Sequence, residues 1–197
     1  LKDMSMTYQK RSFVGRMRGA RWPVLPLLRS GIWVLTSLLS SIVAAQPAGQ
    51  TVDRIKAAYV FNFAKFVELP GSDDKLIRVC VLGKDDLNGA MLSLNRRMAQ
   101  GREIQVRKEV PLDQAKDCSM VFVGESEARI LPAVVRQLGS ASVLLISDAR
   151  QAIDHGAHLS MVFSDDRVEF DVNLLQLQKS SIKASSQMLK LARVVVR

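Results

Sequence analysis

Residues 120–146 have the sequence MVFVGESEARILPAVVRQLGSASVLLI, and the fold class follows largely from this stretch. Met120–Val123 is a short apolar run that ends at a glycine, which is typical of a buried strand. Residues 125–138 have helical spacing interrupted by Pro132, which predicts a kink or a restart of the helix. Val143–Ile146 predicts a second buried strand. Strand, helix and strand in this order are the repeating unit of a parallel sheet.

The same alternation extends toward the N-terminus. Ile77–Leu82 is rich in β-branched residues and ends at a glycine, so it predicts another strand. Asp85 or Asp86 can cap a helix over residues 87–98, and residues 104–110 alternate as a further strand. We therefore expect a mainly parallel sheet with helices on both faces.

The pattern changes near the C-terminus. The dipeptide Asp165-Asp166 separates two alternating runs, residues 159–164 and 167–172, which predicts an antiparallel hairpin. Helical patterns follow over residues 173–179 and 186–196. Together these features predict a single α/β domain with a Rossmann-like or flavodoxin-like layered sheet, mainly parallel and carrying a C-terminal antiparallel hairpin.

Residues 51–67 have the apolar stripe of an amphipathic helix that ends before Pro70. Phe61 falls outside that stripe, on the polar side of the helix, with charged side chains around it. An exposed aromatic side chain within a polar rim resembles an interface anchor. We expect a contact with a partner protein or with a second copy of the chain at four residues: Arg54, Phe61, Lys65 and Glu68.

Residues 1–45 differ in composition from the rest of the chain. Seven basic side chains stand against a single acid, and an uncharged run, residues 31–45, precedes a polar glutamine. This pattern predicts a secretory signal cleaved after Ala45, with Met17 as an alternative start. The run is shorter than the roughly 20 residues of a spanning helix, and an uncleaved anchor is the second interpretation. The expected organisation is a signal peptide (1–45), a flexible lead-in (46–50) and an α/β domain (51–197).

The charge of the chain is concentrated in its first residues. All 197 residues hold 28 basic and 19 acidic side chains, a formal net charge of +9. Removing the seven basic side chains and the one acid of residues 1–45 leaves 21 against 18, or +3, for residues 46–197. We therefore expect no nucleic-acid partner. A composition with 48% hydrophobic and 24% charged residues suits one domain with its own core and excludes a disordered or collagen-like chain.

Two cysteines, Cys80 and Cys118, occur in a chain that we expect to be exported. Cys80 lies in the strand Ile77–Leu82, and Cys118 comes just before the strand Met120–Val123. These two strands are commonly neighbours in a doubly wound sheet, and paired thiols of exported proteins usually form disulfides. A structural bridge, a redox-responsive bridge and two free thiols are the alternatives at this point.

Residues that could carry catalysis or hold a metal are few. His155 and His158 are the only histidines, and without further ligands beside them a solvated turn is the expected role. The chain has neither a nucleophile elbow nor a glycine-rich phosphate loop. We therefore predict that the protein is not an enzyme and needs neither a metal nor a cofactor. Doubly wound sheets bind ligands beyond their strands, which would place a ligand near residues 83–87 and 124–127.

Six stretches in a fixed order resemble the YfiR family of bacterial periplasmic proteins. The first is KAAYVFNFAKF at residues 56–66, and the last is SSQMLKLA at residues 185–192. The others lie between them, at residues 79–83, 101–104, 121–127 and 167–173. The resemblance covers essentially all of residues 51–195.

This resemblance implies an α/β protein of the periplasm that regulates cyclic-di-GMP signalling negatively and influences biofilm growth. Such proteins bind the periplasmic part of an inner-membrane diguanylate cyclase, and an outer-membrane lipoprotein can sequester them. They tend to form homodimers and respond to the oxidation state of their cysteines. Cys80 and Cys118 match one cysteine pair of the family, whereas residues 154–160 (DHGAHLS) lack the second pair. A periplasmic small-molecule sensor that acts through a membrane partner is the alternative function.

Overall fold

The computed structural model describes residues 48–69 and 75–197, all within one compact unit, Ala45–Arg197. The predicted signal peptide and the first residues of the lead-in lie outside the described residues. In chain order the elements are α1 (Ala48–Phe66), β1 (Val67–Glu68), β2 (Leu76–Leu82), η1 (Ala90–Leu94), β3 (Met98–Ala99), β4 (Arg102–Val110), η2 (Leu112–Asp117), β5 (Met120–Val123), η3 (Glu125–Ile130), α2 (Leu131–Leu138), β6 (Leu144–Ser147), β7 (Leu159–Ser164), β8 (Arg167–Asn173), α3 (Leu174–Lys179), β9 (Lys183–Ala184), α4 (Ser186–Leu191) and β10 (Val194–Val196).

An eight-stranded sheet forms the centre of the domain, in the order β10-β8-β7-β6-β5-β2-β4-β3. The five strands from β4 to β7 in that order run parallel to one another, which confirms the mainly parallel sheet. β7 and β8 pair antiparallel, with Ser164 opposite Arg167, so the predicted hairpin is also confirmed. A separate two-stranded sheet joins β1 to β9.

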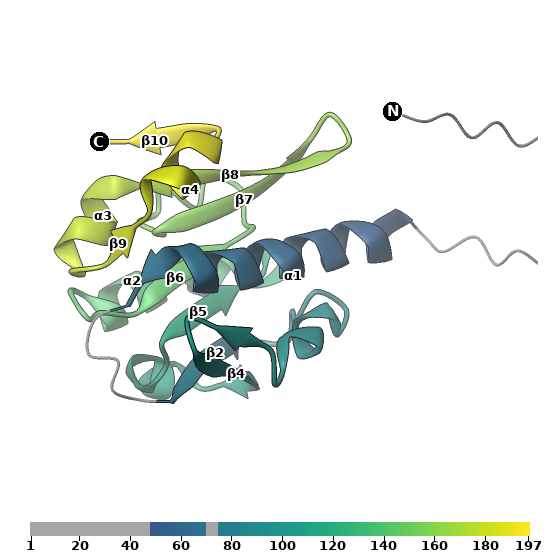
Figure 1. Ribbon diagram of the computed structural model, residues 1–197, viewed down its shortest axis with the longest axis horizontal. Coiled ribbons are helices and arrows are strands. Elements are labelled where there is room, and N and C mark those ends of the chain that lie inside the picture. Colours follow the sequence, from purple (N-terminus) through teal and green to yellow (C-terminus); the bar gives the residue numbers. More distant parts are fainter. Residues whose placement is uncertain (1–47, 70–74) are drawn as a thin grey trace, which may run out of the picture. The chain divides into compact units, whose positions relative to one another are not determined.

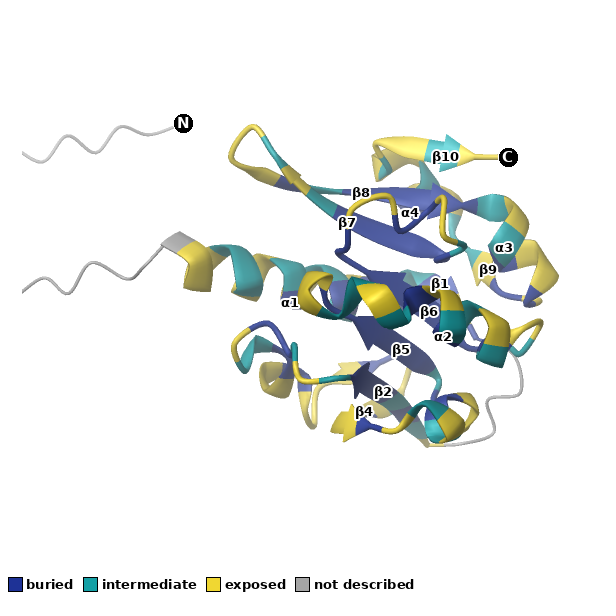
Figure 2. Cartoon of the chain, turned by 180° about the vertical axis from the view of Figure 1, so that it is seen from behind, coloured by how far each residue is buried: buried dark blue, intermediate teal, exposed yellow. Residues whose placement is uncertain are grey.

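Helices cover both faces of the sheet, as the alternation of strands and helices predicts. α1 crosses one face near the middle, where Val60 and Phe63 pack in a core with Phe122 and Phe170 (Figure 1). α2 packs on the opposite face, in a second core that contains Leu131. The central strands β5 and β6 are buried along their whole length, whereas β10 is mostly exposed (Figure 2).

Two predicted helices are wrong over part of their length. The helix expected over residues 87–98 is only the short turn η1, because Asp85 and Asp86 accept hydrogen bonds from the nearby N–H groups of Leu87 and Gly89. These bonds hold a turn with positive φ rather than a helix start. The helix expected over residues 186–196 stops at Leu191, because three consecutive valines favour the strand β10 beside β8.

The segment around Pro132 behaves as predicted. Residues 125–130 form the turn η3, and the α-helix α2 begins afterwards with Pro132 in its first turn. The N–H groups in the first turn of a helix have no hydrogen-bond partner within the helix, so a proline there costs no hydrogen bond. α1 begins at Ala48, so the helix includes part of the stretch that the sequence assigns to a flexible lead-in.

Candidate functional site

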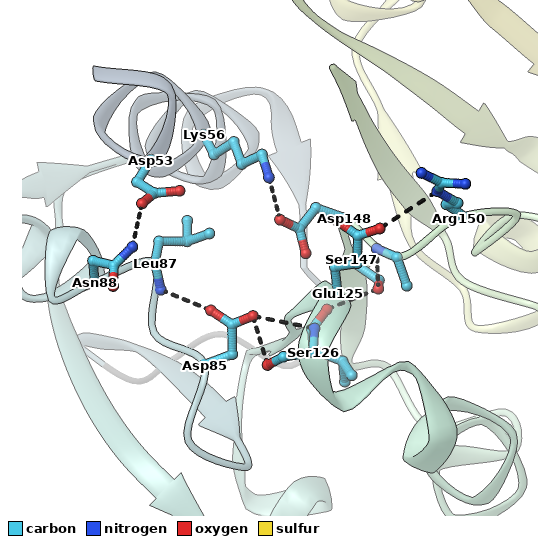
Figure 3. A network of polar contacts seen from close by, with 12 residues as sticks. Asp53, Lys56, Asp85, Leu87, Asn88, Glu125, Ser126, Ser147, Asp148 and Arg150 are labelled. Carbon is cyan, nitrogen blue, oxygen red and sulfur yellow. Dashed lines mark hydrogen bonds and ion pairs between the residues drawn. The ribbon is translucent and has the colours of Figure 1, made fainter. Parts of the chain in front are cut away.

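The carboxyl ends of the parallel strands β2, β5 and β6 meet at one edge of the sheet. Because the three strands are neighbours, the loops that follow them converge beneath the first half of α1 (Figure 3). The sequence predicts that residues 83–87 and 124–127 lie together here. The side chain of Asp85 hydrogen-bonds Ser126, which confirms that these two loops are in contact.

Each of these two loops places a carboxylate against a glycine of the other. Asp85 covers Gly124 and accepts hydrogen bonds from the N–H and the Oγ of Ser126, at 3.3 and 2.9 Å. Glu127 covers Gly83 and accepts from the N–H of Lys84 at 3.2 Å. A Cβ on either glycine would overlap the opposing carboxylate, so both positions need a residue without a side chain. We call this arrangement the loop clasp.

The loop clasp occupies the position where doubly wound folds hold anionic ligands. The oxygens of Asp85 already accept hydrogen bonds from two backbone N–H groups, that of Ser126 at the start of η3 and that of Leu87. Their negative charge also repels a phosphate. The chemistry of the two loops therefore favours internal adhesion over phosphate binding.

A buried ion pair ties α1 to the end of β6. Lys56 Nζ donates to Asp148 Oδ2 at 2.5 Å, and the side chain of Asp148 is only 3% exposed. Burial raises the pKa of Asp148, and the neighbouring Lys56 opposes that rise. Nearby, Asn88 Nδ2 donates to Asp53 Oδ2 at 2.6 Å (Figure 3). Two polar contacts thus fix the first half of α1 over the strand ends.

Phe61 is less exposed than the sequence suggests. Its ring is partly buried and packs against the core on the α1 face of the sheet, so the expectation of a lone exposed aromatic is wrong. The guanidinium carbon of Arg97 lies 3.5 Å from the ring centroid, and Lys65 Nζ lies 5.7 Å from it. Both cations gain cation–π attraction from the same ring. We call Phe61, Lys65 and Arg97 the cationic-aromatic patch.

The other two residues of the predicted interface are Arg54 and Glu68, seven positions before and after Phe61 in the sequence. Arg54 is exposed two turns earlier on α1 and lines a surface hollow with Asn88 and Gly89. Glu68 is exposed in β1, beyond the end of the helix, rather than on the helix itself. Sequence reasoning missed Arg97, because the stretch that contains it was expected to form a separate helix.

Cys80 and Cys118 form a disulfide with a Cα–Cα distance of 6.0 Å. β2 and β5 are neighbours, as predicted, and Cys80 lies opposite Val121 in their register. Both cysteines are buried in the core on the α2 face of the sheet. The bridge joins β2 to the segment just before β5, and it lies in the core on the α2 face, whereas Phe61 packs against the core on the α1 face.

His158 is a buried structural residue, so the solvated turn expected for it is wrong. Its Nδ1 accepts from the N–H of Leu145 at 2.8 Å, and its Nε2 lies 3.1 Å from Ser180 Oγ. The ring thus joins β6 to the end of α3. Burial lowers the pKa of His158 to about 4, which keeps the ring neutral at ordinary pH. His155, by contrast, is exposed.

Two features are absent from residues 48–69 and 75–197. Across these two ranges, no three side chains of the metal-ligating types cluster closely enough to hold a metal ion. Within the same described portion, no helix has the length and apolar character needed to cross a bilayer.

The fold and these contacts define an α/β domain with a disulfide on one face of its sheet and a cationic-aromatic patch on the other side. The chain belongs to the YfiR/HmsC-like family, whose model matches residues 53–193. This membership confirms the resemblance seen in the sequence and supports a general role as a periplasmic regulator.

Two solved structures have a distant similarity to the chain. One is a conserved domain protein from Vibrio cholerae O1 biovar El Tor, with 12% identity and a TM-score of 0.46 over 76% of this chain and 60% of that one. The other is an ABC domain in complex with L-Trp from Streptococcus pneumoniae, with 16% identity and a TM-score of 0.45 over 76% and 62%. The match therefore spans about three fifths of each of these two structures.

Proposed function

We propose that this protein is a periplasmic repressor that binds the periplasmic domain of an inner-membrane diguanylate cyclase and holds cyclic-di-GMP synthesis low. Membership in the YfiR/HmsC-like family over residues 53–193 is the observation that carries this proposal. The proposal includes export by the N-terminal signal, a homodimeric form, release by an outer-membrane lipoprotein and a non-enzymatic role.

The cationic-aromatic patch is the proposed contact surface. Phe61 supplies an apolar centre, and Arg97 and Lys65 form a cationic rim over its ring. The proposed surface also includes Arg54, which is exposed earlier on α1, and Glu68, which is exposed in β1. A patch of this kind fits the usual arrangement of interfaces, in which a buried aromatic is surrounded by polar groups.

Repression requires that the protein bind the inactive form of the cyclase better than the active form. Shifting a 1:99 balance to 99:1 takes roughly 5.5 kcal/mol of differential affinity. A small number of buried anchors can supply a free energy of this size. The patch therefore needs no catalytic group to act as a switch.

The test is deletion of the gene followed by measurement of cellular cyclic-di-GMP. Deletion should raise the nucleotide, and removal of the partner cyclase should abolish the rise. Complementation with Arg97→Glu should fail to restore repression. Arg96→Glu is the matched control, because Arg96 is the exposed neighbour in sequence and carries the same charge. Unchanged cyclic-di-GMP after deletion would refute the proposal.

A sensor that binds a small molecule is the second candidate function. An apolar cavity of about 530 Å³ between α1 and α4 favours it, with Tyr59, Phe63 and Met188 in its lining. Cavities of roughly 300–1,000 Å³ are typical of small-molecule sites. A thermal-shift screen against metabolites separates the two candidates, because a pure protein-binding module should show no ligand-dependent rise in melting temperature.

A further inference from the structure

Asn88 and Gly89 form a chemically labile pair in the loop between β2 and η1. Of the four asparagines in the chain, only Asn88 precedes a glycine. In a flexible peptide the backbone nitrogen of such a glycine attacks the side-chain carbonyl carbon of the asparagine, because the glycine has no Cβ to hinder the approach. The chain therefore carries one asparagine whose sequence favours spontaneous loss of its amide.

The local backbone holds this pair in a tight turn. Asn88 and Gly89 have φ angles of +50° and +82°. The N–H of Ala90 donates to the carbonyl of Leu87 at 2.9 Å. These are the features of a type I′ turn, for which Asn-Gly is the preferred sequence. Ring closure needs a different rotation of the peptide between Asn88 and Gly89, so the turn must open before the pair can react.

Two carboxylates bind the groups that would react. Asn88 Nδ2 donates to Asp53 Oδ2 at 2.6 Å (Figure 3). The N–H of Gly89 donates to Asp86 Oδ1 at 2.9 Å. The attack requires that the side-chain amide and the glycine nitrogen both be free to move. The folded contacts therefore oppose the reaction.

One of these two carboxylates comes from a different part of the chain. Asp53 belongs to the first half of α1, whereas Asp86 lies in the same loop as the labile pair. Asn88 is exposed and lines a surface hollow, so water reaches the turn. Separation of the start of α1 from the loop would thus free the amide of Asn88 in contact with water.

We propose that Asn88 is a deamidation site, protected by its contact with Asp53, that reacts when the start of α1 leaves the loop. In the reaction the nitrogen of Gly89 bonds to Cγ of Asn88, and the bond between Cγ and the amide nitrogen breaks. Ammonia leaves with the proton of the glycine N–H. A water molecule then opens the succinimide ring and yields aspartate or isoaspartate.

The product cannot restore the original contact. A carboxylate at position 88 has no N–H to donate, and it carries the same charge as Asp53 beside it, so the two groups repel each other. Isoaspartate also adds one carbon atom to the main chain of the turn. The modification therefore leaves a permanent record that α1 has separated from the loop. The inference goes beyond the proposed function and does not depend on it.

The test is incubation of the folded protein at mildly alkaline pH, followed by mapping of isoaspartate by mass spectrometry. Trypsin cleaves after Lys84 and Arg96 and gives one peptide that contains both Asn88 and Asn95. Asn95 precedes an arginine and serves as the internal reference. Isoaspartate should form at Asn88 and not at Asn95. In denaturing urea the reaction at Asn88 should be several-fold faster than in the folded protein.

A pair of variants tests the protecting contact. Asp53→Ala removes the partner of Asn88 Nδ2 and should raise the rate at Asn88 several-fold in the folded protein. Asp113→Ala replaces an exposed acid of η2 and is the matched control, with an unchanged rate. Urea titration of both variants establishes that each is folded during the incubation, which separates local release from global unfolding.

A second pair of variants tests the effect of the product. Asn88→Asp should speed hydrogen exchange of the backbone amides of residues 52–55 in α1. The double variant Asp53→Asn/Asn88→Asp exchanges donor and acceptor and should restore the slow exchange. The proposal is overturned by a lack of isoaspartate at Asn88 in the unfolded chain, by equal rates in Asp53→Ala and the natural protein, or by unchanged exchange in Asn88→Asp.

Discussion

Asp85 and Ser126 join the loops that follow the neighbouring strands β2 and β5, through two hydrogen bonds to one carboxylate oxygen, at 3.3 and 2.9 Å. The other oxygen of Asp85 accepts from the N–H of Leu87 at 3.2 Å. One side chain thus shapes its own loop and fastens it to the next. The same crevice is the usual ligand position in doubly wound folds.

Replacement of Asp85 should reveal the strength of the loop clasp in graded steps. Asp85→Ala removes all three hydrogen bonds and should cost about 1–3 kcal/mol of unfolding free energy. Asp85→Asn keeps one acceptor oxygen, so its unfolding free energy should lie between that of the Ala variant and that of the natural protein. Urea titration of the three proteins measures these unfolding free energies. An Asn variant as unstable as the Ala variant would show that the charge, rather than the hydrogen bonds, dominates.

The ion pair between Lys56 and Asp148 predicts an asymmetric response to mutation. Lys56→Met leaves a buried carboxylate without its cation and should cost about 3–5 kcal/mol at neutral pH. The double variant Lys56→Met/Asp148→Asn removes both charges and should recover most of that loss. Chemical denaturation at pH 7 gives both values, and a double variant no more stable than the single one would contradict the account.

The same single variant should depend on pH with a definite sign. Burial raises the pKa of Asp148 above its ordinary value of 3.8, so the folded state holds a proton that the unfolded state releases. The proton on Asp148 therefore stabilises the folded state at low pH. This stabilisation is lost as the pH rises through the pKa that Asp148 has in the folded state. Without Lys56 the pKa of Asp148 should rise further. The cost of Lys56→Met should consequently shrink as the pH falls from 7 toward 5.

Much of the fold is predictable from the sequence because local and long-range preferences agree there. Apolar runs such as Met120–Val123 must be buried on both faces, which only a central parallel strand allows. The prediction fails over residues 87–98, where two aspartates bind nearby N–H groups and stop a helix. It also fails at Val194–Val196, where a neighbouring strand decides the conformation.

The candidate site is less predictable, because it depends on contacts between distant residues. Composition and position assign Phe61 to the surface, but nothing in the sequence places Arg97 over its ring. The loop clasp is similar: the convergence of two loops follows from strand order, whereas the covering of Gly124 by Asp85 depends on side-chain placement. Hydrogen-bonding of His158 to Leu145 likewise needs the packed structure.

His158 predicts a loss of stability in acid. Burial lowers its pKa to about 4 from 6.5, so below pH 6.5 the unfolded state takes up a proton that the folded state excludes. Stability is fully present above 6.5 and falls as the pH drops toward 4, by about 3 kcal/mol in total. His158→Asn retains an acceptor for the N–H of Leu145 and should flatten this dependence. His155→Gln is the exposed control, and an unchanged slope in the Asn variant would assign the acid sensitivity elsewhere.

The disulfide between Cys80 and Cys118 is predicted to contribute to stability in addition to any regulatory effect. It closes a loop with a sequence separation of 38, for which loop-closure entropy gives about 4 kcal/mol. Cys80→Ala/Cys118→Ala should therefore lower the melting temperature, and the natural protein under reducing agent should approach the same value. Mass spectrometry of periplasmic material without reductant should show the two cysteines linked. A cross-link restricts the unfolded chain and so raises the melting temperature, unless it strains the folded protein. If loss of the bridge changes partner affinity and leaves the melting temperature unaltered, the bridge is therefore regulatory rather than structural.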